Sequence, residues 1–295
     1  MEVVVYIVIA VLTSFATSLS YKFACQRKID HLSAPCLLCG IASLLIAALY
    51  FVLAIVSGNT LSPVTVLCSL IGGGSYFIAA FCYLNALHIG PFAVTAALLN
   101  FSNLLPVVYS AVFLKGQSIG WLQMVGLGLL ALAVIGLATS KKRAQKGEGF
   151  SVKWLMWIIP MFISNSFINF GSRLQVYLTG GNESFYYGMS AFLFSALLCV
   201  SVFFLLGGQR AVGRVDFRRN FLPALCLALS LGINLIAHLR LPAMNIPAVI
   251  QYPIISGSST ILAMIVGICV FGDRIRFYGY LSIAGGIASM VLLNL

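Results

Sequence analysis

The chain has 295 residues, of which 61% are hydrophobic and only 8% are charged. Soluble domains carry about a quarter charged residues, so this composition excludes a water-soluble globular protein. A net charge of +11 is found in nucleic-acid-binding proteins, but here no basic patch is interleaved with aromatic residues, which argues against that class.

Apolar stretches of about 20 residues, each long enough to cross a bilayer core, recur along the whole chain. Continuous apolar runs favour helices over barrel strands, which alternate over shorter segments. The first stretch lacks a basic start and a small-residue cleavage site, so we expect a retained helix. The ten predicted transmembrane helices lie near 3–23, 33–56, 62–84, 91–113, 117–139, 152–173, 184–206, 219–239, 246–271 and 276–294.

The basic residues gather in one set of loops. All of the 17 Lys and Arg residues except Lys115, Arg173 and Arg240 lie in or beside the odd-numbered loops between predicted spans. Cytoplasmic loops of membrane proteins carry such an excess of Lys and Arg. We therefore expect a multi-pass protein of the cell (plasma) membrane with its odd-numbered loops in the cytoplasm and both chain ends outside.

The two halves of the sequence resemble each other. A shift of 156 residues aligns Gly90-Pro91 with Ile246-Pro247, and a shift of 151 aligns Ser14 and Ser18 with Asn165 and Asn169. Five spans per half would make the second half enter the membrane in the opposite sense, which is the inverted repeat common among secondary transporters. The predicted divisions are a first five-helix repeat over 1–140, a basic linker over 141–151 and a second five-helix repeat over 152–295.

Loose motifs surround the fourth span and its counterpart in the second half. They are Ala86-Leu87-x-x-Gly90-Pro91, Ala93-Val94-x-Ala96-x-Leu98, Pro106-Val107, Gly126-x-Gly128 and Gly272-Asp273-x-Ile275. With the five-plus-five pattern, these motifs resemble the EamA-type transporters of the drug/metabolite transporter superfamily. The resemblance implies export or exchange of small metabolites by alternating access. The family's usual Gly-Glu hairpin is altered here to Lys115-Gly116-Gln117 and Gly272-Asp273.

Polar side chains at regular spacing mark the candidate site, because polar groups inside a bilayer are costly and point inward or toward water. Four-residue spacing places Ser14, Ser18 and Lys22 on one helix face, and repeats with Asn165, Asn169 and Arg173. We predict a substrate site near the midplane between the halves. The predicted site residues are Ser14, Ser18, Tyr76, Asn100, Asn103, Asn165, Asn169, Arg173, Asn234, His238, Gln251 and Tyr252, and the predicted hinges are Pro106 and Pro253.

Each of these features also has a purely structural interpretation. The stripes are able to join helices by hydrogen bonds, and tyrosines near span ends are typical of interfacial belts. His238 fits a proton relay or a hydrogen-bonded histidine. A proline removes a donor and frees a carbonyl one turn earlier, which either neighbouring Ser and Asn side chains or a substrate must satisfy.

The six acidic residues all lie outside the middles of the predicted spans, which disfavours proton-coupled export of hydrophobic cations. A cavity that contains cations and amides but no acids is suited to binding a carboxylate or phosphate group. We therefore expect a secondary-active transporter, an exporter or exchanger, of a small neutral or anionic metabolite. The alternatives are a lipid or lipid-linked sugar flippase on the same scaffold and a membrane receptor or scaffold without transport.

No catalytic motif lies at membrane depth, so we expect no enzymatic activity and no cofactor. Cys36-x-x-Cys39 lacks the second pair of ligands that a zinc site needs, and no metal site is predicted. The expected partners are a small-molecule metabolite and the lipid bilayer, with no nucleic acid. The chain is expected to be a monomer or a homodimer.

Overall fold

A computed structural model of the chain describes residues 2–26, 34–58, 60–103, 105–107, 109, 120–139, 152–207, 217–273 and 277–293. These residues form helices and, within the described ranges, no strand. The helices are α1 (Glu2–Gln26), α2 (Ala34–Ser57), α3 (Pro63–Ile89), α4 (Phe92–Ser102), α6 (Trp121–Thr139), α7 (Val152–Thr179), α8 (Ser184–Leu205), α9 (Phe217–Ala243), α10 (Ala248–Cys269) and α11 (Phe277–Leu293).

Seven helices in the described part are long and apolar enough to cross a membrane by length and composition. They are α1, α2, α3, α7, α8, α9 and α10, and a shorter apolar stretch runs over Phe92–Val107. Their outward faces carry large apolar side chains, such as Val56 with 79% and Leu67 with 63% of its surface exposed. Such surfaces suit lipid rather than water, so the chain has the architecture of an all-α membrane protein.

Local sequence explains where two long helices begin and end. Ser62 caps α3 by accepting a hydrogen bond from the Thr65 N–H, and α3 continues beyond the predicted end at 84 until Gly90 precedes Pro91. Helix α7 also passes its predicted end at 173 and stops at Thr179. It ends there because Gly180 adopts a positive φ of 65°, a conformation that glycine reaches without steric cost.

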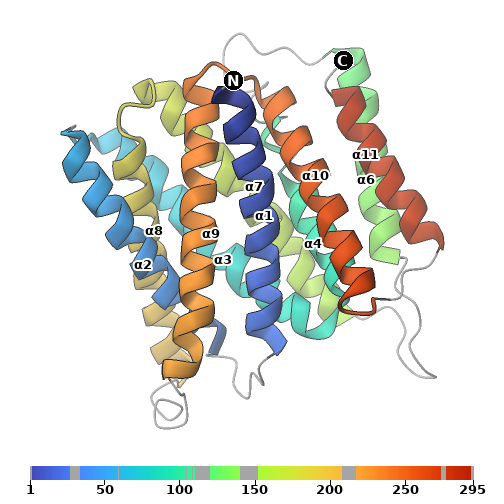
Figure 1. Cartoon of the computed structure of the whole chain (residues 1–295), viewed down its shortest axis with the longest axis horizontal. Helices are drawn as coiled ribbons and strands as arrows, with labels where there is room; N and C mark the ends of the chain where they lie inside the picture. The colour runs from blue at the N-terminus through green and yellow to red at the C-terminus, as the bar shows by residue number, and fades with distance from the viewer. Residues whose placement is uncertain are drawn as a thin grey trace.

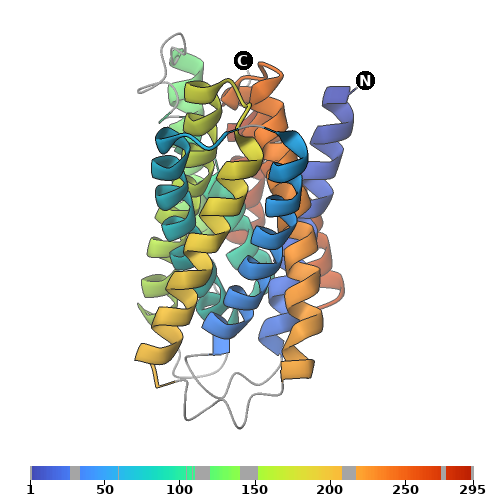
Figure 2. The ribbon, with the colours of Figure 1, turned by 90° about the vertical axis from the view of Figure 1, so that its left-hand side faces the viewer.

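The helices stand side by side as a single bundle (Figures 1 and 2). Helices α2 and α8 form one flank and α6 and α11 the other, with the remaining helices between them (Figure 1). The start of α1 and the end of α11 lie at the same end of the bundle (Figure 1). The central helices are therefore the ones placed to enclose a site.

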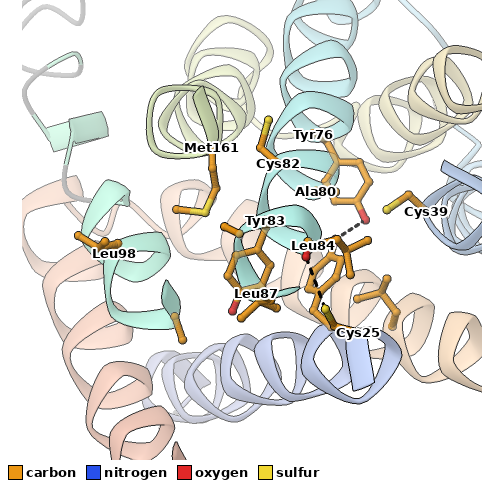
Figure 3. Packing of buried hydrophobic residues seen from close by; sticks show 14 of the residues in the cluster. Cys25, Cys39, Tyr76, Ala80, Cys82, Tyr83, Leu84, Leu87, Leu98 and Met161 are labelled. Atoms are coloured by element: carbon orange, nitrogen blue, oxygen red, sulfur yellow. Dashed lines mark hydrogen bonds between the residues drawn. The ribbon is translucent and has the colours of Figure 1, made fainter. Parts of the chain in front are cut away.

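Glycine permits the close packing of α3 on α8. A Cβ atom at Gly73 would meet the Ala191 carbonyl, and one at Gly72 would meet the Tyr187 hydroxyl. Only a residue without a side chain allows the two backbones to approach so closely. The same packing continues into a buried core that contains Tyr76, Tyr83 and Leu84 of α3 (Figure 3).

Two segments that the sequence analysis singled out lie outside the described residues. The basic linker over 141–151 and the hairpin Lys115-Gly116-Gln117 lie outside the described residues. The predicted hinges are described: Pro106 is buried shortly after the end of α4, and Pro253 is buried inside α10.

Candidate functional site

A cavity of about 120 Å³ lies among six helices, α1, α3, α4, α7, α8 and α9. A buried water needs on the order of 10–15 Å³, so the cavity has room for a small molecule or several waters. Among the described residues, its lining contains no Asp, Glu, Lys or Arg. The space is therefore bounded by neutral polar groups, aromatic rings and aliphatic side chains.

The structure brings nine of the twelve predicted site residues to the wall of this one cavity. They are Ser14, Ser18, Tyr76, Asn100, Asn103, Asn165, Asn169, Asn234 and His238. The other three, Arg173, Gln251 and Tyr252, lie behind the wall. Gln251 and Tyr252 contact His238 and Asn169 of the lining, and Arg173 contacts Gln251.

An asparagine cluster joins α7 to the end of α4. The Asn103 Oδ1 atom accepts hydrogen bonds from Asn165 Nδ2 at 2.7 Å and Asn169 Nδ2 at 2.8 Å. Asn165 Nδ2 also lies 2.8 Å from Ser102 Oγ and 3.2 Å from the Leu99 carbonyl. Pro106 cannot donate to the Ser102 carbonyl one turn earlier, and α4 accordingly ends there. The cluster therefore ties α7 to the C-terminal end of α4.

A second polar cluster joins α9 to α1. Asn234 Nδ2 lies 2.8 Å from Ser14 Oγ, 3.0 Å from Thr13 Oγ1 and 3.1 Å from the Ala10 carbonyl. Both polar clusters thus combine a structural role with a place in the cavity wall. The Asn234 and Asn165 amide nitrogens are occupied by protein acceptors.

Thr17 and Asn100 of the wall each carry a polar atom that has no such partner. Thr17 Oγ1 and Asn100 Nδ2 are buried without a hydrogen bond in the described structure, and both residues line the cavity. Their side chains are 8% and 3% exposed. An unpaired buried polar group costs about 1–3 kcal/mol. A ligand or ordered water that pairs with these two atoms would remove that cost.

Arg173 lies beside the cavity and carries a buried charge. Its guanidinium donates to Gln251 Oε1 at 3.1 Å and to the Ile246 carbonyl at 3.0 Å, and both of these acceptors are neutral. Gln251 Nε2 in turn lies 3.2 Å from His238 Nδ1. Tyr252 donates from its hydroxyl to the Asn169 carbonyl at 3.2 Å. The predicted stripe on α7 therefore reaches the cavity only through its first two members.

Aromatic rings form another part of the cavity wall. The Tyr21 and Tyr76 hydroxyls are 3.0 Å apart, and Tyr21 meets Tyr83 edge-on with ring centroids 5.2 Å apart. Tyr76 packs against Phe192 at 4.9 Å. Figure 3 shows Tyr76 and Tyr83 on the same helix, with the hydrogen bond of the Tyr76 hydroxyl drawn as a dashed line. This wall offers ring faces and edges to a flat or apolar part of a ligand.

Five lining residues with polar side chains were absent from the predicted set. They are Thr17, Tyr21, Tyr83, Ser172 and Tyr187. Thr17 and Tyr21 follow Ser14 at helical spacing, so a wider stripe on α1 would have included them. Tyr187 carries no such periodic signal, because its place depends on the packing of α8 against Gly72.

Metal ligands do not gather in the described residues, where no group of three or more His, Cys, Asp or Glu side chains is placed to hold an ion. Cys36 and Cys39 are both buried on α2. The arrangement therefore offers hydrogen bonding and ring contacts to a ligand.

Two acidic side chains contact helix N-termini outside the spans. Asp273 Oδ2 accepts from the Ala93 N–H at 2.7 Å, and burial raises the pKa of Asp273 despite this bond and the nearby Lys22. Glu183 Oε2 accepts from the Ser62 N–H at 3.0 Å and the Ser62 hydroxyl at 2.7 Å. Burial acts to raise the pKa of Glu183, but hydrogen bonds from Thr65 and Ser62 outweigh it, and the net pKa is lowered.

Comparison with known proteins identifies a fold and nothing more specific. No protein-family model matches the chain, and no curated protein sequence matches it. One solved structure, described only as "Crystal structure of protein", is similar to it with a TM-score of 0.59 and 15% sequence identity. The similarity covers 97% of this chain and 98% of the other. At that identity the likeness concerns the fold of the whole chain.

Proposed function

We propose that this protein is a secondary-active transporter that moves a small neutral or anionic metabolite by alternating access. Ten transmembrane helices in two inverted five-helix repeats enclose the substrate site, as in the EamA-type transporters that the sequence resembles. The observation that carries the proposal is the neutral polar cavity, to which each proposed repeat contributes three helices.

Helix packing supports the repeat. The proposed repeat pairs α1 with α7, α2 with α8, α3 with α9, α4 with α10 and α6 with α11. When the two members of every pair are exchanged, the packing of α3 on α7 becomes that of α9 on α1. The same exchange relates α3–α8 to α9–α2 and α1–α10 to α7–α4, while α2–α8, α4–α10 and α6–α11 map onto themselves. All of these helix pairs are in contact. Such a pattern is expected of two halves related by a two-fold axis in the membrane plane.

The chemistry of the lining supports the substrate class. A hydrophobic cation would need a buried carboxylate, and the described lining has none. Amide and hydroxyl groups bind neutral polar ligands directly. An anionic group would draw on the buried charge of Arg173, one residue beyond Ser172 in the wall.

The test compares the metabolites of cells with and without the protein, followed by uptake of the leading candidates into reconstituted vesicles. Thr17→Phe fills the cavity, whereas Leu67→Phe adds the same ring to an outward-facing position on α3. We expect the wild type and Leu67→Phe to transport the same metabolite and Thr17→Phe to lose most of the uptake.

A second variant keeps the test informative if Thr17→Phe fails to fold. Thr17→Val keeps the side-chain volume and removes only the unpaired hydroxyl, so it should fold and show weakened substrate affinity. Equal uptake by all four proteins would contradict the proposal, as would transport of lipids alone in the same vesicles.

A further inference from the structure

The orientation of the Gln251 side-chain amide is fixed by Arg173. A guanidinium has only donors, so the Gln251 atom that it contacts at 3.1 Å must be the carbonyl oxygen Oε1. Consequently the amide nitrogen Nε2 points the other way, toward His238. Gln251 itself is fully buried, which separates this position from bulk solvent.

A proline supplies an independent constraint on the same amide. Pro242 lies inside α9 and has no N–H, so the carbonyl of His238, four residues earlier, has no helical donor. Gln251 Nε2 lies 3.5 Å from that carbonyl and 3.2 Å from His238 Nδ1. The two hydrogens on Gln251 Nε2 thus face two atoms of His238, the carbonyl oxygen and Nδ1. Both contacts require the same orientation of the Gln251 amide.

These contacts determine the state of the imidazole. Because Gln251 Nε2 is a donor, His238 Nδ1 must be the acceptor and carries no hydrogen. In a neutral imidazole the hydrogen then sits on Nε2, at the other edge of the ring. Tyr252 stacks on the ring with centroids 5.8 Å apart and an interplanar angle of 22°, which holds its plane.

We propose that Arg173 is a positioning residue that, through Gln251, holds His238 in the Nε2–H form so that the cavity presents a hydrogen-bond donor to its ligand. His238 lines the cavity, and the unpaired Asn100 Nδ2 is a second donor in the same wall. The ligand therefore carries at least two acceptor atoms, such as carbonyl or hydroxyl oxygens or ring nitrogens. The ligand part of this inference rests on the proposed function, whereas the form of the imidazole does not.

The test reads the imidazole by NMR in purified protein made with isotope-labelled histidine. The chain has 3 histidines, and replacing His31 and His88 with Gln leaves His238 as the reporter. The nitrogen shifts of the wild-type background should show hydrogen on Nε2 and none on Nδ1. Gln251→Glu presents a carboxylate to both neighbours, so Nδ1 should gain a hydrogen while Arg173 keeps its partner.

Two variants at Arg173 separate positioning from general packing. Arg173→Met removes the donor on Gln251 Oε1 and should produce a second signal with hydrogen on Nδ1, whereas Arg173→Lys keeps a donor there and should restore the wild-type signal. Hydrogen on Nδ1 in the wild type, or no change in Gln251→Glu or Arg173→Met, would overturn the inference. Because the signal needs no transport, a failure of the proposed function leaves a different signature, namely normal NMR spectra without uptake.

Discussion

At each end of the bundle an acidic side chain accepts a hydrogen bond at the start of a helix, but the pKa of the acid is lowered at one end and raised at the other. At one end Glu183, just before α8, bonds to Ser62 at the start of α3. At the other end Asp273, between α10 and α11, bonds to the Ala93 N–H at the start of α4. Helix α3 has 27 residues and spans roughly 40 Å, so the two contacts are separated by about the thickness of a membrane.

The difference between the two contacts lies in what surrounds each carboxylate. Burial acts to raise the pKa of Glu183, but Glu183 is partly exposed and accepts several hydrogen bonds, and these lower its pKa overall. Asp273 is half-buried beside Gly267, and desolvation raises its pKa more than Ala93 and Lys22 lower it. An acid at a helix N-terminus is therefore stabilised as an ion only where water or enough donors remain. The Asp273 end depends on tight packing, and the Glu183 end depends on several partly buried hydrogen bonds.

The largest effect is expected from crowding the Asp273 end. A Cβ atom at Gly267 would lie 2.7 Å from Ala93 Cβ and 3.1 Å from Asp273 Oδ2, so Gly267→Val should force α10 away from α4. Overpacking costs about 1–3 kcal/mol, and thermal unfolding in detergent measures it. Gly128→Ala is the control, since nothing lies within 4 Å of its added Cβ. Equal stability of the two variants would show that this end is loosely packed.

A smaller effect should follow from removing the acceptor at Ala93. The N-cap of α4 is Pro91, which offers no side-chain hydrogen bond, so Asp273 replaces it from another part of the chain. Asp273→Ala should cost about 0.5–2 kcal/mol, the usual value of a lost cap. Asp273→Asn keeps an acceptor and removes a charge that burial disfavours, so its unfolding temperature should stay near that of the wild type. A large loss in Asp273→Asn would contradict the electrostatic part of the comparison.

The smallest mutational effect is expected at the solvated end. Glu183→Gln keeps one acceptor oxygen for Ser62 and removes a partly exposed charge. Contributions of exposed charges are mostly about 0–1 kcal/mol and are screened by salt. The loss in unfolding free energy should therefore be a fraction of that caused by Asp273→Ala and should shrink at high salt. A salt-independent loss as large as that of Asp273→Ala would refute the contrast.

The two acids should also give pH dependences of opposite sign. The pKa of Glu183 is lowered by folding, so its stabilisation is present above the ordinary Glu value of about 4.3 and is lost as pH falls through the folded pKa. The pKa of Asp273 is raised, so stability falls as pH rises from the ordinary Asp value of about 3.9 through the folded pKa. In a plot of unfolding temperature against pH, Glu183→Gln should lack the loss of stability at falling pH, and Asp273→Asn should lack the loss at rising pH. Identical profiles for the two variants would contradict the assignment.

Within the described residues, helices lie where the sequence has continuous apolar runs, and the differences from the predicted spans lie at helix ends. Seven of these helices are long and apolar enough to cross a membrane, and the arrangement of ten spans in two repeats stays a prediction. Of the four-residue stripes on α1 and α7, Ser14, Ser18, Asn165 and Asn169 line the cavity, since both helices run unbroken through those positions, whereas the last members, Lys22 and Arg173, do not. Whether these residues bind a substrate stays a prediction.

The position of Arg173 could not be predicted in the same way. The spacing of α7 places it in line with Asn165 and Asn169, but its partners Gln251 and Ile246 lie 78 and 73 residues further along the chain. The cap on α4 by Asp273 spans 180 residues. Contacts of this kind depend on how the helices pack, which periodicity within one helix does not encode.

Access to the cavity from both sides of the membrane is the most direct test of alternating access, and it needs no knowledge of the substrate. In a background without the 8 native cysteines, Ser18→Cys introduces a small thiol into the cavity wall, and Leu67→Cys serves as the outward-facing control. The proteins are reconstituted in one known orientation, and a membrane-impermeant thiol reagent is added to either side. Alternating access predicts that Ser18→Cys reacts from each side and that Leu67→Cys reacts from neither. Reaction of Ser18→Cys from one side only, or from neither, would contradict the account.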